Sequence, residues 1–188
     1  PYAVSKRTNE LYAHVFSTVY GMEIIGLRYF NVFGKNQDPD SPYAAVIPKF
    51  FKSLLNEESP TIYGDGETTR DFCYVENVVH ANLLAMEVKD AEAFNQVYNI
   101  AYGKQTSLNE LFKMIKEIIV EYLGNSGYKE KAERILNIEP VYGPFRKGDI
   151  RHSLADISKA KKLLGYEPKV DVKIGLYLAC KFYLGIIM

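Results

Sequence analysis

Tyr2 and Lys6, near the start of the chain, have the residue types and the spacing of a proton-transfer pair. Residues four apart lie on one face of a helix, close enough for their side chains to interact. A nearby ammonium group stabilises a phenolate, which lowers the pKa of the tyrosine and makes it a usable general base. Tyr177 and Lys181 repeat the spacing, and we interpret them as an ordinary helix pair. The spacing alone therefore identifies no site, and the surrounding sequence must decide.

The apolar pattern predicts helices that alternate with short buried strands. Leu11, Val15 and Val19 recur at helical spacing, and Gly21 follows as a C-cap. The predicted helices span residues 3–20, 44–56, 75–86, 106–122, 156–165 and 171–185. The predicted strands span residues 23–30, 61–63, 70–74, 96–101 and 138–142, with a polar break over 124–131. This alternation indicates the α/β class.

Composition argues against several kinds of partner. The 188 residues carry 23 Lys and Arg against 23 Asp and Glu, a formal net charge of zero. A balanced charge disfavours nonspecific binding to nucleic acid or to anionic membranes, and no apolar run approaches the ~18 residues of a membrane span. Cys73 and Cys180 are predicted to be buried, reduced thiols of a cytoplasmic protein. His14, His80 and His152 are scattered, so no metal site is expected.

A series of motifs extends from Tyr2 along nearly the whole chain. It comprises Pro1-Tyr-Ala-Val-Ser-Lys6, Asn9-Glu10, Gly26-Leu-Arg-Tyr-Phe-Asn-Val-Phe-Gly34, Gly64-Asp-Gly66, Arg70-Asp-Phe72, Tyr98-Asn-Ile100, Ser107-Leu108, Gly148-Asp149 and Ser158-Lys-Ala160. In these motifs the chain resembles the extended short-chain dehydrogenase/reductase family of NAD-dependent sugar-nucleotide epimerases and dehydratases. Gln37-Asp-Pro39 and Arg151-His-Ser-Leu154 make it most similar to the UDP-N-acetylglucosamine 4-epimerases of that family.

The resemblance implies the C-terminal part of a Rossmann-type doubly wound sheet together with a smaller α/β substrate-binding domain. Residues 1–33 and about 75–105 are expected in the remnant of the NAD-binding domain, and residues about 34–74 and 106–188 in the sugar-nucleotide-binding domain. Family members begin with a glycine-rich turn whose amides hold the pyrophosphate of NAD, and no such pattern occurs here. The sequence is therefore expected to be the C-terminal portion of a longer enzyme.

The reaction that the resemblance implies is NAD-dependent 4-epimerisation of a UDP-sugar through a 4-keto intermediate, with UDP-GlcNAc and UDP-GalNAc preferred. Tyr2 would be the acid/base that takes the proton of the sugar 4-hydroxyl. Lys6 would lower the pKa of Tyr2 and hydrogen-bond the nicotinamide ribose. Tyr29 would line the nicotinamide end, unless it is simply strand core. Without an upstream half, the chain by itself is expected to be inactive.

The resemblance also names the residues that would bind the sugar nucleotide. They are Asn31, Gln37, Ala45, Val46, Tyr63, Arg70, Arg146, Asp149 and Ser153. Arg70 and Arg146 suit a diphosphate, because forked guanidinium donors match its oxygens. Asn31 would also contact the diphosphate, Tyr63 would pack on uracil, and Asp149 would accept from the ribose. The competing interpretations are an ion pair of Arg70 with Asp71, a core position for Tyr63, a turn at Asp149 and plain packing for residues 45–46.

Ser153 carries the expected substrate preference. It stands where many UDP-galactose epimerases have a bulky tyrosine against the sugar C2 substituent, and a small serine leaves room for an acetamido group. Pocket volume discriminates here because a bulky side chain would clash with that group. Gln37 is expected beside the same pocket, and a neutral surface hydroxyl is the competing interpretation of Ser153.

Two other functions stay open at this point. One is a nucleotide-sugar 4,6-dehydratase or decarboxylase of the same family, which needs a further group from an upstream half. The other is a non-catalytic sugar-nucleotide binding or interaction module. Because family members often dimerise through a bundle containing the Tyr–Lys helix, a homodimer is expected. Leu11, Val15 and Val19 could equally belong to the intramolecular core.

Overall fold

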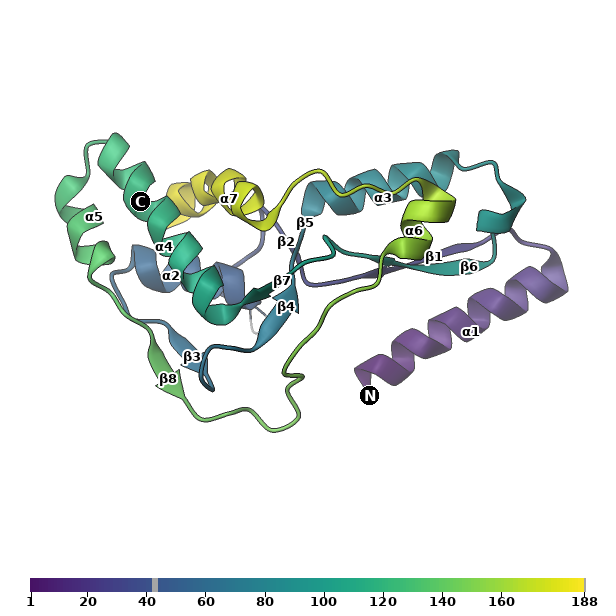
Figure 1. Cartoon of the computed structure of the whole chain (residues 1–188), viewed down its shortest axis with the longest axis horizontal. Helices are drawn as coiled ribbons and strands as arrows, with labels where there is room; N and C mark the ends of the chain where they lie inside the picture. The colour runs from purple at the N-terminus through teal and green to yellow at the C-terminus, as the bar shows by residue number, and fades with distance from the viewer. Residues whose placement is uncertain (42–43, 188) are drawn as a thin grey trace.

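The structure is a computed structural model that describes residues 1–41 and 44–187, in which helices and short strands alternate (Figure 1). The helices are α1 (Tyr2–Tyr20), α2 (Val46–Leu55), α3 (Val75–Glu87), α4 (Leu108–Asn125), α5 (Lys129–Leu136), α6 (Ser158–Leu164) and α7 (Val172–Ile187), with a 3-10 turn η1 (Ala91–Ala93). The strands are β1 (Ile25–Tyr29), β2 (Val32–Phe33), β3 (Thr61–Tyr63), β4 (Thr69–Asp71), β5 (Cys73–Tyr74), β6 (Gln96–Ile100), β7 (Gln105–Ser107) and β8 (Val141–Gly143). None of the helices described is long and apolar enough to cross a membrane.

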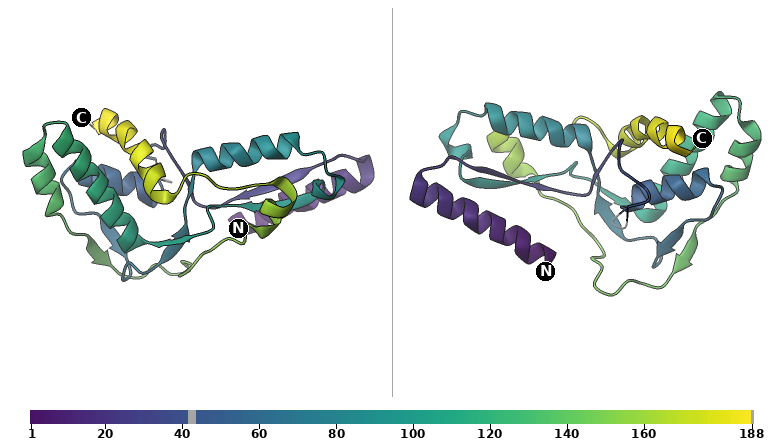
Figure 2. Two further views of the ribbon diagram at one scale, coloured as in Figure 1. Left: turned by 45° about the horizontal axis from the view of Figure 1, so that its top comes forward. Right: turned by 180° about the vertical axis from the view of Figure 1, so that it is seen from behind.

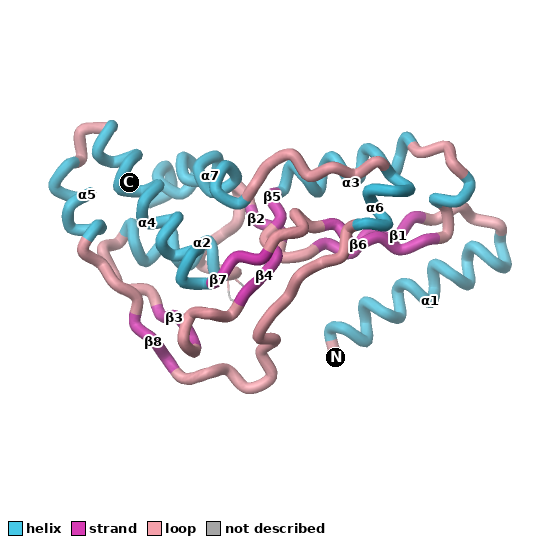
Figure 3. The backbone as a smooth tube through the Cα atoms, viewed as in Figure 1, coloured by secondary structure: helices cyan, strands magenta, loops and turns pink. Residues whose placement is uncertain are grey.

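The strands of the described residues form four separate pairs, drawn in magenta in Figure 3. Three pairs are parallel, β1 with β6, β2 with β5 and β3 with β8, whereas β4 and β7 are antiparallel. Parallel strands need long crossover connections, usually through a helix, and the long connection between β1 and β6 includes α2 and α3. The fold is therefore α/β, as predicted.

Two hydrophobic clusters occupy opposite ends of an elongated molecule (Figure 2). One cluster contains Tyr98 and Ile100 of β6, which pack with α3 and α6. The other is built mainly from α2, α4 and α7, where the rings of Phe51 and Tyr183 stack with centroids 4.5 Å apart. The molecule thus has two cores, and the domain boundaries suggested by the resemblance stay a prediction.

Most predicted elements form close to their expected bounds where a local signal specifies them. Ser107 caps α4 by accepting from the N–H of Glu110, and the Glu110 carboxylate accepts from the N–H of Ser107. Gly21 ends α1 with φ 67°, in the left-handed region. Cys73 and Cys180 are buried free thiols, as predicted.

Helix α5 corrects the sequence prediction. The polar break expected over 124–131 is wrong at both ends, because α4 continues to Asn125 and α5 begins at Lys129. Only Ala132 and Ile135 of this helix are buried, so its apolar stripe is too sparse to show a helical period. The short strands β2 and β7 were also not predicted, since two or three residues cannot show an alternation.

Helix α1 buries none of its side chains. Leu11, Val15 and Val19 are 51%, 50% and 66% exposed, so the interpretation of this face as intramolecular core is wrong. The right view of Figure 2 shows α1 running beside the β1–β6 pair, on the side opposite α3. The placement of this helix therefore depends on something other than a buried apolar stripe.

Candidate functional site

The predicted site residues gather at two hollows. The first, of about 1150 Å³, lies between α1 and the β1–β6 pair, and Tyr2, Lys6 and Tyr29 are part of its lining. The second, of about 620 Å³, lies beside the start of α2 and strands β3 and β4. We call them the α1 hollow and the α2 hollow.

Tyr2 and Lys6 lie one helical turn apart in the α1 hollow. The Lys6 Nζ atom is over the Tyr2 ring, 5.4 Å from its centroid, as the four-residue spacing predicts. Tyr2 is 75% exposed. Within residues 1–41 and 44–187, neither the phenol nor the ammonium hydrogen-bonds another side chain or a carbonyl. Both groups are therefore available to the oxygen atoms of a ligand.

Tyr29 lies at the border of the α1 hollow. It is 49% exposed, so its interpretation as strand core is wrong. Its hydroxyl donates to Oδ1 of Asn82 on α3, at 3.0 Å. Because successive side chains of a strand point to opposite faces, Tyr29 faces α3 while Arg28 faces α1. The structure thus directs the Tyr29 hydroxyl away from Tyr2.

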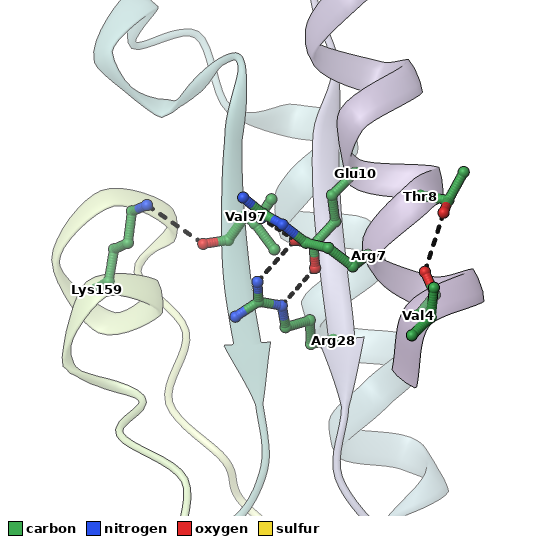
Figure 4. A network of polar contacts seen from close by, with 7 residues as sticks. All are labelled: Val4, Arg7, Thr8, Glu10, Arg28, Val97 and Lys159. Atoms are coloured by element: carbon green, nitrogen blue, oxygen red, sulfur yellow. Dashed lines mark hydrogen bonds and ion pairs between the residues drawn. The ribbon is translucent and has the colours of Figure 1, made fainter. Parts of the chain in front are cut away.

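An ion-pair network crosses the α1 hollow, as Figure 4 shows. The Glu10 carboxylate accepts from Nε and Nη2 of Arg28 at 2.5 and 2.8 Å, and from Nη1 of Arg7 at 2.7 Å. The hydrogen bonds from Arg28, reinforced by Arg7, lower the pKa of Glu10 to about 2. Glu10 was not among the predicted site residues. The signal that could have found it is its place in the row Tyr2, Lys6, Glu10.

The α2 hollow collects residues from distant segments of the chain. Its lining includes most of the predicted substrate residues: Asn31, Ala45, Val46, Tyr63, Arg70, Arg146 and Asp149. They come from the turn after β1, the start of α2, strands β3 and β4, and the segment after β8. The buried rings of Phe50 and Phe72 form part of the wall. The hollow therefore combines an apolar wall with two guanidinium groups.

The charged groups of the α2 hollow contact one another. Arg70 Nη2 donates to Oδ1 of Asp149 at 2.5 Å, so its ion-pair partner is not the neighbouring Asp71 that the sequence suggested. The guanidinium of Arg146 lies over the Tyr63 ring, 3.8 Å from the centroid. Tyr63 is an exposed residue, so its interpretation as core is wrong. This wall offers donors for an anion and a ring for a planar group.

Asn31, which lines the α2 hollow, is held by a hydrogen bond to the backbone of Asp71. It has φ 35°, an uncommon value for a residue other than glycine. Its Nδ2 atom donates to the carbonyl of Asp71 at 3.0 Å. The Asp71 carboxylate is fully buried and accepts from the N–H groups of Tyr102, Gly103 and Ala155. Burial raises the pKa of Asp71 despite these bonds.

Gln37 and Ser153 lie outside the lining of the α2 hollow. Gln37 Nε2 donates to the carbonyl of Val32 at 3.2 Å, and its buried Oε1 has no partner among the described residues. Ser153 lies on a segment that runs beside β4, and its N–H donates to the carbonyl of Thr69 at 3.2 Å. Their roles at a sugar stay predictions.

Two lysines of the α2 hollow were not predicted. Lys49 and Lys52 lie on α2 and line the hollow, and Lys52 forms an ion pair with Asp40. The available signal was helical spacing, since Lys49 follows Ala45 by four residues and Val46 by three.

Comparisons with known proteins match one family along the chain. Residues 1–101 match the model of the NAD dependent epimerase/dehydratase family. A solved UDP-glucose 4-epimerase of Thermotoga maritima, with UDP-glucose, is 42% identical with a TM-score of 0.85, and the match covers 100% of this chain and 54% of that one. A UDP-N-acetylglucosamine 4-epimerase of Methanobrevibacter ruminantium, in complex with UDP-N-acetylmuramic acid, is 41% identical with a TM-score of 0.84, covering 99% and 54%.

A relative compared by sequence is also a UDP-sugar 4-epimerase. The UDP-glucuronate 4-epimerase of Thermodesulfobacterium geofontis is 32% identical over 177 residues, which cover 94% of this chain and 48% of the relative. The chain spans about half the length of the curated relatives that it matches.

Proposed function

Because this chain belongs to the NAD dependent epimerase/dehydratase family, we propose that it is the sugar-nucleotide-binding part of an NAD-dependent UDP-sugar 4-epimerase that prefers UDP-GlcNAc and UDP-GalNAc. The observation that carries the proposal is the α2 hollow, where residues suited to a nucleoside diphosphate meet from distant segments. The similar proteins named above are UDP-sugar 4-epimerases, which supports the reaction class.

The α2 hollow binds the nucleotide in this proposal. Arg70 and Arg146 hold the diphosphate, because a guanidinium gives two parallel donors to its oxygens, and Asn31 adds an amide at the same place. Tyr63 packs against the uracil ring, and Asp149 accepts from the ribose hydroxyls. Residues 45–46, at the start of α2, lie beside the nucleotide and the sugar.

The α1 hollow suits the cofactor end of the reaction, since it presents a phenol and an ammonium that no other described residue binds. When bound, NAD would supply a carbon that accepts a hydride from sugar C4 and returns it to the other face of the 4-keto sugar, which inverts C4. Tyr2 takes the 4-hydroxyl proton at its phenol oxygen and gives it back. Lys6 stabilises the phenolate form and donates to the cofactor ribose. Tyr29 borders the same hollow and lines the nicotinamide end in this proposal, although its hydroxyl is directed toward α3.

Ser153 and Gln37 set the sugar preference in this proposal. A serine leaves space for a 2-acetamido group that a tyrosine would fill, so discrimination comes from volume. We therefore expect a Ser153→Tyr substitution in the complete enzyme to weaken UDP-GlcNAc selectively.

We propose that the chain contributes to two domains of the complete enzyme. In this proposal residues 1–33 and about 75–105 belong to the NAD-binding domain, and about 34–74 and 106–188 to the sugar-nucleotide-binding domain. The two hydrophobic clusters support this division except at residues 155–166, which pack in the cluster around β6 and α3. The 188 residues alone lack a glycine-rich pyrophosphate turn, so we propose that they do not catalyse hydride transfer. The complete enzyme is a cytoplasmic homodimer in this proposal, and the exposed apolar face of α1 supports a partner there.

The decisive test is a turnover assay of the complete enzyme with UDP-GlcNAc, UDP-GalNAc and UDP-glucose, with the 188-residue chain as control. We expect interconversion of the first two substrates, slower reaction of UDP-glucose, and no turnover by the control. Equal or reversed preference would contradict the argument from Ser153, and turnover by the control would contradict its proposed inactivity. A product that has lost water or carbon dioxide would identify a dehydratase or decarboxylase. Binding of UDP without turnover by the complete protein would identify a binding module.

A further inference from the structure

Helix α1 carries the proposed proton-transfer pair, and little within the described chain holds it in place. It buries no side chain against residues 1–41 and 44–187, so packing within this chain does not fix how the helix is rotated about its axis. A rotation of one residue would turn Tyr2 and Lys6 by about 100°, away from the α1 hollow. Some directional contact must therefore set the rotation.

That contact lies in the row formed by Tyr2, Lys6 and Glu10, which follow one another at intervals of four residues. The Glu10 carboxylate receives two hydrogen bonds from Arg28 at 2.5 and 2.8 Å (Figure 4). Among the described residues, these are the hydrogen bonds that connect the side chains of α1 to the rest of the chain. Arg28 is in turn fixed on β1, where it lies opposite Asn99 of β6.

We propose that Glu10 is a positioning residue, whose two-pronged ion pair with Arg28 sets the rotation of α1 so that Tyr2 and Lys6 face the α1 hollow. The inference rests on the proposed function, because it gives Glu10 its effect through Tyr2. Two parallel hydrogen bonds fix orientation as well as distance, which a single bond or an apolar contact does not. Arg7, at 2.7 Å from the same carboxylate, orients the Glu10 side chain from within the helix.

The ion pair between Glu10 and Arg28 is expected to affect the rotation of α1 more than the stability of the chain. The Arg28 side chain is 50% exposed and that of Glu10 is 15% exposed, so water screens the pair from the Arg28 side and limits its contribution to stability. Glu10→Gln also keeps the shape of the side chain, so the chain should still fold. Misplacing a catalytic group by about 1 Å can nevertheless cost about 100-fold in rate. Loss of the pair should therefore lower turnover while the chain still folds and still binds its substrate in the separate α2 hollow.

The chain offers a matched control pair. Arg134 on α5 donates to Glu57 from Nε and Nη2 at 2.6 and 3.1 Å, the same chemistry in a part of the molecule without proposed catalytic groups. Glu57→Gln removes a comparable ion pair and should leave turnover unchanged.

The test in the complete enzyme compares Glu10→Gln with Glu57→Gln and with Tyr2→Phe. We expect Glu10→Gln to lower kcat by about 10- to 100-fold with the KM for the UDP-sugar within about twofold, and Glu57→Gln to change neither. Unchanged kcat in Glu10→Gln, while Tyr2→Phe is inactive, would overturn the positioning role alone. Full activity of Tyr2→Phe would overturn the proposed function itself.

A distance measurement on the 188-residue chain tests the geometry without activity. Spin labels at Tyr12→Cys on α1 and Met86→Cys on α3 are selective, because both side chains are exposed and both native cysteines are buried. We expect one narrow distance distribution in the parent and in Glu57→Gln, and a broadened or shifted one in Glu10→Gln. A narrow, unshifted distribution in Glu10→Gln would overturn the proposal.

Discussion

At the scale of single residues, Arg70 shows how a strand separates neighbours in the sequence. Side chains alternate along a strand, so Arg70 faces the α2 hollow and pairs with Asp149, while Asp71 faces the interior. A guanidinium that is bound to one carboxylate at the edge of a hollow can exchange that partner for a diphosphate, which offers more anionic oxygens. Arg70 can therefore serve the proposed function because its side chain faces the α2 hollow.

We predict that Arg70→Leu weakens UDP binding to the chain. A hydrogen bond to a charged group is worth about 1.5–3 kcal/mol, which corresponds to about a 10- to 100-fold increase in Kd. Isothermal titration with UDP measures the change. Arg134→Leu removes a guanidinium that does not line the α2 hollow and should keep the parent affinity. Equal affinities of the two variants would refute the assignment of Arg70 to the diphosphate.

We predict that Tyr2→Phe in the complete enzyme lowers kcat by about 100- to 10,000-fold, the usual contribution of a proton-transfer group. The KM for the UDP-sugar should change little, because the nucleotide binds in the α2 hollow. Steady-state kinetics measure both. Tyr12→Phe removes the hydroxyl of another exposed tyrosine of α1 and should be fully active. A Tyr2→Phe enzyme as active as this control would exclude Tyr2 as the acid/base.

At the scale of elements, α4 and α1 represent opposite ways of placing a helix. Helix α4 has a complete capping box and buries Leu111, Ile115 and Ile119, so its start and its rotation follow from local sequence. Helix α1 has an N-cap without a side-chain hydrogen bond and buries nothing. Its rotation in this chain depends on the long-range pair of Glu10 and Arg28.

We predict that Ser107→Ala lowers the free energy of unfolding by about 1 kcal/mol, because the first turn of α4 loses the acceptor for the Glu110 N–H. Denaturant titration of the 188-residue chain measures this difference. Ser126→Ala, at the other end of the same helix, removes a hydroxyl that caps no N–H group and should have a smaller effect. Equal losses would mean that the box does not specify the start of α4.

At the scale of the whole molecule, Asp71 joins the two hydrophobic clusters. Its own strand β4 leads into Phe72, which belongs to the cluster of α2, α4 and α7. Its carboxylate accepts from the backbone of Gly103 and Ala155, which flank the cluster around β6. One buried side chain thus connects the segments that carry the two hollows.

We predict that Asp71→Ala lowers the free energy of unfolding by more than about 3 kcal/mol. The substitution leaves the buried N–H of Ala155 and the partly buried N–H groups of Tyr102 and Gly103 without an acceptor, and a lost acceptor costs about 1–3 kcal/mol for a buried group. Asp65→Ala is the comparison, because it removes an exposed carboxylate paired with Arg151 and should cost about 1 kcal/mol or less. Denaturant titration of both variants gives the two values, and a similar small loss in each would show that Asp71 does not join the clusters.

Prediction from sequence succeeded where a signal is local. The α/β class, the capping box at Ser107 and the C-cap at Gly21 depend on spacing within a few residues, and the structure has all three. It failed at α5, whose few buried residues do not form a visible stripe. At the site, most of the predicted substrate residues line one hollow, whereas Gln37 and Ser153 do not.

Local periodicity is enough to predict the alternation of helices and strands and the placing of Tyr2 and Lys6 on one helix face. It does not predict that Arg70 pairs with Asp149, that Glu10 binds Arg28, or that Tyr29 turns toward α3. These contacts join residues that are 18 to 79 positions apart. They depend on where the crossover connections bring the strands together, which no pattern of neighbouring residues encodes.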